Sequence, residues 1–214
     1  TDVFTEQLAS GLEKHGIKVA IDWLPLRAEY APWSVKAPIP PCWARIAHVN
    51  SWLSTRFIPK HMMVLTTIHH SIHDPNLLQY KGVARALYHR YWIQHLEAAN
   101  LERADSIVAV SADAALLARK VFGLFDIKVI HNGVDSRDLT LTERSAQNSP
   151  FRLLYVGTWM TRKGVDLFER ILRELGPSYE LLCIGGEPGK DERANFPGNI
   201  KFLGRISDRK TLVT

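Results

Sequence analysis

The chain has 214 residues, of which 46% are hydrophobic and 23% charged, a balance that excludes a disordered chain and is typical of a globular protein. Its net charge of +5 is spread over both halves without an arginine-rich arm, zinc-finger spacing or RNP-type motif, so nucleic acid is not an expected partner. The longest apolar runs, such as 62–65 and 153–156, fall far short of the ~18 residues of a membrane-spanning helix.

The first predicted element is an amphipathic helix. Phe4, Leu8 and Leu12 recur at every fourth position, Gly16 ends the helix, and the apolar run 17–21 predicts a short strand. A helix of this kind normally follows a strand with a glycine-rich turn, so we expect the first strand of the domain to be missing from this chain.

A long loop and a strand with two terminal histidines follow. Residues 24–42 contain five prolines, and a loop of this length is usually functional. We interpret 43–58 as a helix and 62–70 as a buried strand that ends at His69 and His70.

The rest of the first half alternates helices and strands. We expect a long helix over 82–104, with Val83, Leu87 and Tyr91 along its apolar stripe. Three shorter elements follow: a strand over 106–110, a helix over 111–123 that Ser111 caps and Gly123 ends, and a strand over 127–130.

A polar stretch, 141–150, lacks hydrophobic periodicity and predicts a linker. Beyond it we expect a strand from Phe151, a helix over 165–175 that Gly176 and Pro177 end, and strands over 179–185 and 200–204.

This alternation predicts an α/β fold with parallel sheets. The linker separates a Rossmann-like domain over 1–140 from a second, incomplete one over 151–214. Ligands of open α/β sheets bind at the carboxyl ends of the strands, so we expect a site in a cleft between the two domains. The candidate residues, which follow predicted strands, are His69, His70, Ser111, Asn132, Gly157, Thr158, Arg162, Lys163, Gly204 and Arg205.

The run 69–74 contains three histidines and an aspartate, which raises the alternative of a zinc site. Neither an HExxH helix nor a CxxC pair accompanies the run, and it lies where a strand enters a loop, so no metal is expected. We favour a substrate contact by a histidine at the ligand edge, and a loop histidine that only forms hydrogen bonds is the alternative.

Arg162 and Lys163 place two positive charges where a strand leads into a helix N-terminus. The helix dipole is already positive there, so cations are unfavourable unless an anion binds beside them. Lys163 and the free backbone N–H groups of the helix can bind a phosphate, and a solvated surface lysine is the alternative. The nearby run 184–191 lacks the P-loop spacing, and we interpret Gly185 as part of a tight strand exit.

Cys42 and Cys183 lie far apart in the sequence, each in an apolar context. We expect buried free thiols rather than a disulfide, and therefore a reducing cytoplasmic location.

Several short motifs follow one another in order along the chain. The first half contains VFTEQLASGLEKHGIKV, VLTTIHH and ADSIVAVS, and the second begins after VIHNGVD and contains LLYVGTWMTRKGVDLF, LLCIGG and NIKFLGRIS. Over nearly the whole chain, these motifs resemble a family 4 glycosyltransferase with the GT-B fold. The resemblance implies transfer of a sugar from a nucleotide-sugar donor to an acceptor, with retention at the anomeric carbon, without a cofactor and usually without a metal.

By that resemblance, Lys163 would hold the donor diphosphate, and Gly157 would let the diphosphate approach the backbone. His69 would contact the transferred sugar on the acceptor side. Gly204 and Arg205 would lie near the nucleobase.

One position departs from the family pattern. Thr158 stands where the family often has an arginine, and we expect Arg162 to supply that charge. The further candidates on the acceptor side are His70, Ser111 and Asn132.

The family's paired glutamates on a later helix are absent from the chain, which ends at Thr214. We therefore expect an internal fragment of a larger enzyme that is inactive alone. A different GT-B enzyme, such as a sugar-nucleotide epimerase, and a non-catalytic nucleotide-sugar-binding paralogue are the alternatives. The acceptor class stays open among glycan, lipid-linked sugar and small molecule.

Tyr30 and Trp33 lie in the proline-rich loop, and Lys81, Arg85 and His89 recur at every fourth position nearby. Aromatic and basic residues together suit a polar acceptor or peripheral contact with the inner face of an anionic membrane. A solvated helix face is the alternative.

Overall fold

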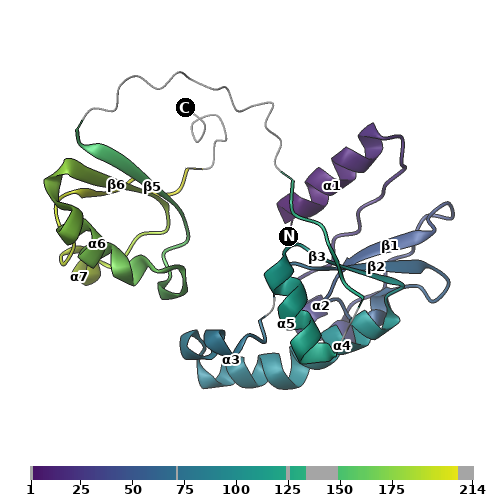
Figure 1. Cartoon of the computed structure of the whole chain (residues 1–214). Helices are drawn as coiled ribbons and strands as arrows, with labels where there is room; N and C mark the ends of the chain where they lie inside the picture. Colours follow the sequence, from purple (N-terminus) through teal and green to yellow (C-terminus); the bar gives the residue numbers. More distant parts are fainter. Residues whose placement is uncertain (1, 71, 124–125, 134–148, 207–214) are drawn as a thin grey trace. The chain divides into compact units, whose positions relative to one another are not determined.

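The computed structural model describes residues 2–70, 72–123, 126–133 and 149–206. The chain divides into two compact units, 1–133 and 134–214, and the described strands of each unit form one parallel sheet (Figure 1). The predicted α/β class with two parallel sheets is therefore confirmed. Of the linker predicted over 141–150, all but the last two residues lie outside the described residues.

The sheet of the first unit has four parallel strands among the described residues. In strand order it consists of β1 (Ile46–Asn50), β2 (Met63–Ile68), β3 (Ser106–Ala109) and β4 (Lys128–Val129), all parallel.

The helices of the first unit include a long run that changes hydrogen-bonding pattern in its middle. This run consists of α3 (Val83–Tyr88), a π-helical segment (His89–Ile93) and α4 (Gln94–Arg103). The other described helices are α1 (Asp2–Lys14), α2 (Arg27–Tyr30), α5 (Ala112–Phe122) and 3₁₀ turns at Pro32–Ser34, Thr55–Phe57 and Pro75–Tyr80.

Helix α5 begins and ends where the sequence predicts. The Ser111 hydroxyl accepts a hydrogen bond from the Ala114 N–H at 3.1 Å, which satisfies one of the free donors of the first turn. Gly123 ends the helix with a φ of 68°, a conformation that glycine adopts without a Cβ clash. The alanines of this helix pack against the sheet in a core formed by Ile68, Leu101, Ile107, Ala109, Ala114, Ala115, Ala118 and Ile127.

Two predicted elements of the first unit are wrong. Within the predicted helix 43–58, residues 46–50 form strand β1, because alternate residues face inward and the backbone pairs with β2. The predicted strand 17–21 has no sheet partner among the described residues, and Ile17 and Ile21 are exposed.

The long helical run buries a different face from the predicted one. Val83, Leu87 and Tyr91 are 78%, 50% and 63% exposed, so the predicted apolar stripe does not pack into the core. The face that is buried contains the polar residues Glu97 and Asn100. Such burial is stable only when each polar group has a hydrogen-bond partner.

Asn100 finds its partners on two neighbouring segments. Its Oδ1 accepts from the Thr66 hydroxyl on β2 at 2.7 Å, and its Nδ2 donates to the Leu53 carbonyl at 2.8 Å. The Glu97 carboxylate accepts from the Ser51 hydroxyl at 2.7 Å and lies 3.0 Å from His73 Nε2. These contacts tie α4 to the segments that leave β1 and β2.

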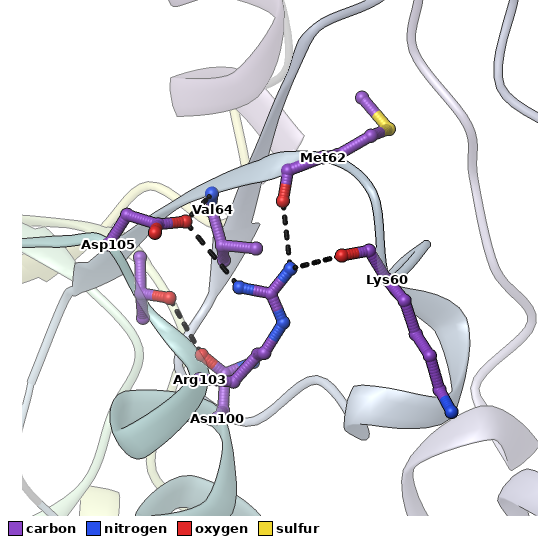
Figure 2. Close-up of polar contacts among 7 residues, drawn as sticks. Lys60, Met62, Val64, Asn100, Arg103 and Asp105 are labelled. Atoms are coloured by element: carbon purple, nitrogen blue, oxygen red, sulfur yellow. Dashed lines mark hydrogen bonds and ion pairs between the residues drawn. The ribbon is translucent and has the colours of Figure 1, made fainter.

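The end of α4 is tied to the start of β2 in the same way, as Figure 2 shows. The Arg103 guanidinium donates to the Met62 carbonyl at 2.8 Å and to the Lys60 carbonyl at 3.2 Å. Asp105 accepts from the Val64 N–H at 2.7 Å. The helix is therefore fixed along its length by polar contacts that hydrophobic periodicity does not predict.

The second unit agrees with the predicted elements. Its sheet consists of β5 (Phe151–Gly157), β6 (Tyr179–Gly185) and β7 (Ile200–Phe202) in that order, and its α-helices are α6 (Phe168–Leu175) and α7 (Lys190–Arg193). Leu172, Leu181 and Cys183 form the buried core. Both cysteines are free thiols, but Cys42 is exposed, contrary to the prediction.

Candidate functional site

In the second unit, the carboxyl ends of the three strands meet at a set of glycines. Gly157 ends β5, Gly185 ends β6, and Gly204 follows β7. The Gly186 N–H donates to the Gly157 carbonyl at 3.1 Å, and the Gly185 N–H donates to the Gly204 carbonyl at 2.8 Å. The backbone of three separate segments is therefore joined at one edge of the sheet.

These strand exits have no room for larger side chains. Gly185 has a φ of +120°, and a Cβ there would lie 2.2 Å from the Gly157 carbonyl oxygen. A Cβ at Gly186 would lie 2.5 Å from the Trp159 backbone nitrogen. Since real Cβ atoms do not approach backbone so closely, glycine is required at both positions.

Lys163 lies over the same edge. It is the last residue of a 3₁₀ turn, Thr161–Lys163, and Gly164 then reverses the chain with a φ of 76° before the helical residues begin at Val165. A Cβ at Gly157 would lie only 3.3 Å from the Lys163 Nζ atom. The side chain therefore folds back from the helix entrance onto the end of β5.

A cluster of aromatic rings positions the loop that carries Lys163. The Tyr155 hydroxyl donates to the Thr158 carbonyl at 2.8 Å, and the Trp159 indole N–H donates to Glu192 at 2.9 Å. The Trp159 ring contacts those of Tyr155, Phe168, Phe196 and Phe202, with centroids 5.3 to 6.4 Å apart. Sequence reasoning missed this support, although aromatic residues at 155, 159 and 168 were visible in it.

The remaining predicted residues of this unit are exposed. Thr158, Arg162 and Arg205 all lie at the surface, and Arg205 directly follows Gly204. Neither Arg162 nor Lys163 forms an ion pair within the described part of the chain. The edge thus carries positive charge that no described carboxylate neutralises, which suits an anion.

In the first unit, the predicted residues also follow adjacent strands at one edge. His69 follows β2, Ser111 follows β3, and Asn132 follows β4. Backbone hydrogen bonds join these exits, since the Val110 N–H donates to the Ile68 carbonyl at 3.1 Å.

The half-buried His69 packs edge-on against Phe4 of α1, with ring centroids 4.5 Å apart. Burial lowers the pKa of His69, so its imidazole is neutral near pH 7 and can donate one hydrogen bond and accept another. Phe4 also contacts His48, whose Nε2 shares a 2.7 Å hydrogen bond with the Thr67 hydroxyl. Sequence reasoning missed His48 because it placed β1 in a helix.

The other acceptor-side candidates have different surroundings. His70 is exposed and lies beside Trp52, with ring centroids 5.3 Å apart. The hydroxyl of Ser111 caps α5, so a structural role accounts for this residue. Asn132 is exposed.

Within the described ranges, no group of three or more His, Cys, Asp or Glu side chains is arranged to hold a metal ion. Among the same residues, no helix is both long and apolar enough to cross a membrane.

Comparison with solved structures identifies the architecture. The crystal structure of TarM is 12% identical to this chain, with a TM-score of 0.52, over 78% of this chain and 34% of TarM. The apo form of the lipopolysaccharide outer core galactosyltransferase WaaB is 20% identical, with a TM-score of 0.44, over 72% of this chain and 40% of WaaB. The likeness to TarM shows the fold alone, which is the GT-B fold with its two parallel α/β units.

The sequence itself identifies the family. Residues 5–138, more than half of the chain, match the model of Glycosyltransferase Family 4. The chain therefore belongs to glycosyltransferase family 4, and the family resemblance of its motifs is confirmed. No curated protein matches the chain.

Proposed function

We propose that this protein transfers a sugar from a nucleotide-sugar donor to an acceptor, with retention of configuration at the anomeric carbon. Membership of family 4 supports glycosyl transfer in general. The observation that carries the finer proposal is the position of Lys163 Nζ over the glycine exit of β5.

In this proposal, Lys163 binds the diphosphate of the sugar donor. The diphosphate leaves with added negative charge in the transition state, and a fixed cation beside accessible backbone N–H groups stabilises that charge. Gly157 lets the diphosphate approach the backbone, Arg162 adds a second charge in place of the one that Thr158 lacks, and Gly204 and Arg205 border the nucleobase.

The first unit supplies the acceptor side. His69, whose pKa is lowered by burial and whose ring packs against Phe4, contacts the transferred sugar through hydrogen bonds to its hydroxyl groups. His70 and Asn132 are the exposed residues of that edge that would contact the acceptor. No cofactor enters the proposal, and no metal ion is required because the diphosphate charge is met by Lys163 and Arg162. The two free thiols accord with a cytosolic enzyme.

The proposal is tested by product analysis with the full-length protein. The protein is incubated with a panel of nucleotide sugars and sugar acceptors, and the products are followed by NMR of the anomeric proton. A new glycosidic bond with the donor's anomeric configuration supports the proposal. An inverted linkage, a free epimerised nucleotide sugar, or binding without turnover over the whole panel would contradict it.

A further inference from the structure

A cavity in the first unit lies beside the segment that follows β2. It has a volume of ≈ 330 Å³, within the range of about 300 to 1,000 Å³ typical of small-molecule sites. Its walls come from the segment after β2, from the helical run 83–103 and from α5. The basic side chains and imidazoles that line it are those of His73, Lys81, His89 and Arg90.

The charge of this cavity is one-sided. Lys81 and Arg90 are cations, His73 and His89 add imidazole rings, and none of the described lining residues is acidic. Two carboxylates lie nearby. Glu97 accepts from the Ser51 hydroxyl and lies 3.0 Å from His73 Nε2, and Asp74, which accepts from the Asn76 N–H, partly offsets the lowering of the Lys81 pKa by burial.

The positive charge around the cavity affects the pKa of His89. Burial lowers the pKa of His89, and the positive charges of Lys81 and His73 lower it further. Its Nδ1 atom is buried and has no hydrogen-bond partner among the described residues. A bound anion would relieve the repulsion around His89, because it would bring negative charge among these cations.

Each of the two cations makes one local contact. Lys81 donates a hydrogen bond to the Ile72 carbonyl, and the Arg90 guanidinium lies 5.8 Å from the centre of the Tyr91 ring. An ammonium, a planar guanidinium and two imidazoles together offer more donors than a single carboxylate can accept. A phosphate group, with its greater charge and its several oxygens, satisfies more of them.

We propose that the cavity bounded by His73, Lys81, His89 and Arg90 is a binding site for a phosphate group. The segment that lines it begins two residues after His70, on the acceptor side of the proposed active site. The phosphate is therefore assigned to a phosphorylated sugar acceptor, and this assignment, unlike the site itself, rests on the proposed function. A soluble sugar phosphate and the headgroup of an anionic lipid share the required chemistry.

Binding is measured by calorimetry on the full-length protein, with inorganic phosphate, a hexose 6-phosphate and the unphosphorylated hexose as probes. Arg90→Gln is the main variant because Arg90 is exposed, and Lys81→Gln is the second. Loss of one charge-assisted hydrogen bond is expected to weaken phosphate binding about tenfold or more. Arg90→Lys should retain part of the affinity, and Lys120→Gln, which removes an exposed cation of α5, should bind as the wild type does.

Equal phosphate binding by Arg90→Gln, Lys81→Gln and Lys120→Gln, with all three folded, would overturn the site. Co-sedimentation with phosphatidylglycerol vesicles, against phosphatidylcholine vesicles as the control, separates the two sources. Binding to the soluble hexose phosphate but not to the vesicles supports the sugar acceptor, and the reverse result overturns that assignment in favour of a lipid headgroup. The nucleotide affinity of Arg90→Gln should be unchanged, so failure of this site and failure of the proposed donor site are distinguishable.

Discussion

The two units hold their candidate sites in different ways. In the second unit, the edge of the sheet is made of backbone: glycines end or follow the strands, and one lysine folds over them. In the first unit, the edge carries side chains that pack against other elements, as His69 packs against Phe4 of α1, and buried polar contacts join α4 to the sheet and to the segments that follow β1 and β2. The edge of the second unit depends on glycines at the ends of its strands, whereas the first unit depends on polar side chains whose partners lie about 30 to 50 residues away in the sequence. Four substitutions test this difference.

The largest effect is expected for Gly185→Ala. A Cβ at this position would lie 2.2 Å from the Gly157 carbonyl oxygen, at a φ of +120° that alanine rarely adopts. We expect the unfolding free energy of the second unit to fall by more than about 3 kcal/mol. Hydrogen exchange of β5 and β6 measures the change.

Gly198→Ala is the matched control, since its Cβ would meet nothing within 4 Å. Equal hydrogen-exchange protection of β5 and β6 in the two variants would show that this edge tolerates side chains. The two units would then not differ in the way described above.

Asn100→Ala is expected to have the next largest effect, confined to the first unit. The change leaves the buried Thr66 hydroxyl and the Leu53 carbonyl without their partner. Such groups cost about 1 to 3 kcal/mol, so we expect a loss of about 2 to 3 kcal/mol in the stability of the first unit. Denaturant unfolding followed by region-resolved hydrogen exchange is the measurement.

Gln7→Ala, which removes an exposed amide on α1, serves as its control. A loss of protection that spreads equally over both units would mean that the units unfold together and are not separately stabilised.

Lys163→Ala tests function rather than stability. The contact between this ammonium and a diphosphate is a charge-assisted hydrogen bond worth about 1.5 to 3 kcal/mol. We expect the catalytic efficiency to fall about 10- to 150-fold, with weaker donor binding and an unchanged melting temperature. The lysine is exposed, so little stability depends on it.

Arg170→Ala, on the exposed surface of α6, provides the comparison for a cation of the same unit. If the folded Lys163→Ala variant bound nucleotide sugar and turned it over as Arg170→Ala does, Lys163 would be only a solvated surface lysine.

The smallest effect is expected for Ser111→Ala. Loss of the N-cap of α5 should destabilise the first unit by about 1 kcal/mol. Ser111→Asp retains a capping oxygen and should keep most of the stability. If the alanine variant kept its stability while its KM for the acceptor rose, the residue would act on the acceptor and not as a cap.

Helices and strands were predicted correctly from the sequence where hydrophobic pattern and end signals agree. The strands over 63–68, 106–109, 151–157 and 179–185 are short apolar runs with clear ends, and α5 carries its own start and stop signals. The glycines that end the strands were also predicted, and the role of Lys163 as an anion contact stays a prediction.

The errors fall where two structures fit the same pattern. Residues 46–50 alternate in the strand sense, yet Ile46, Val49 and Leu53 also fit a helical face, and only pairing with β2 decides between them. Val83, Leu87 and Tyr91 show a different error. Their helical spacing predicted the helix correctly, but these three side chains are exposed and another face of the helix is buried.

The sequence alone determined the α/β class and the family, and it predicted which second-unit residues form the candidate donor site. Tertiary structure alone decided which face of the long helix is buried, and that Glu97, Asn100 and Arg103 bind it to neighbouring segments. It also decided that two cations and two histidines line one cavity. The physical reason is that a polar side chain can be buried only where partners from other segments satisfy it, and those partners are fixed by the folded chain and not by the residue's neighbours in sequence.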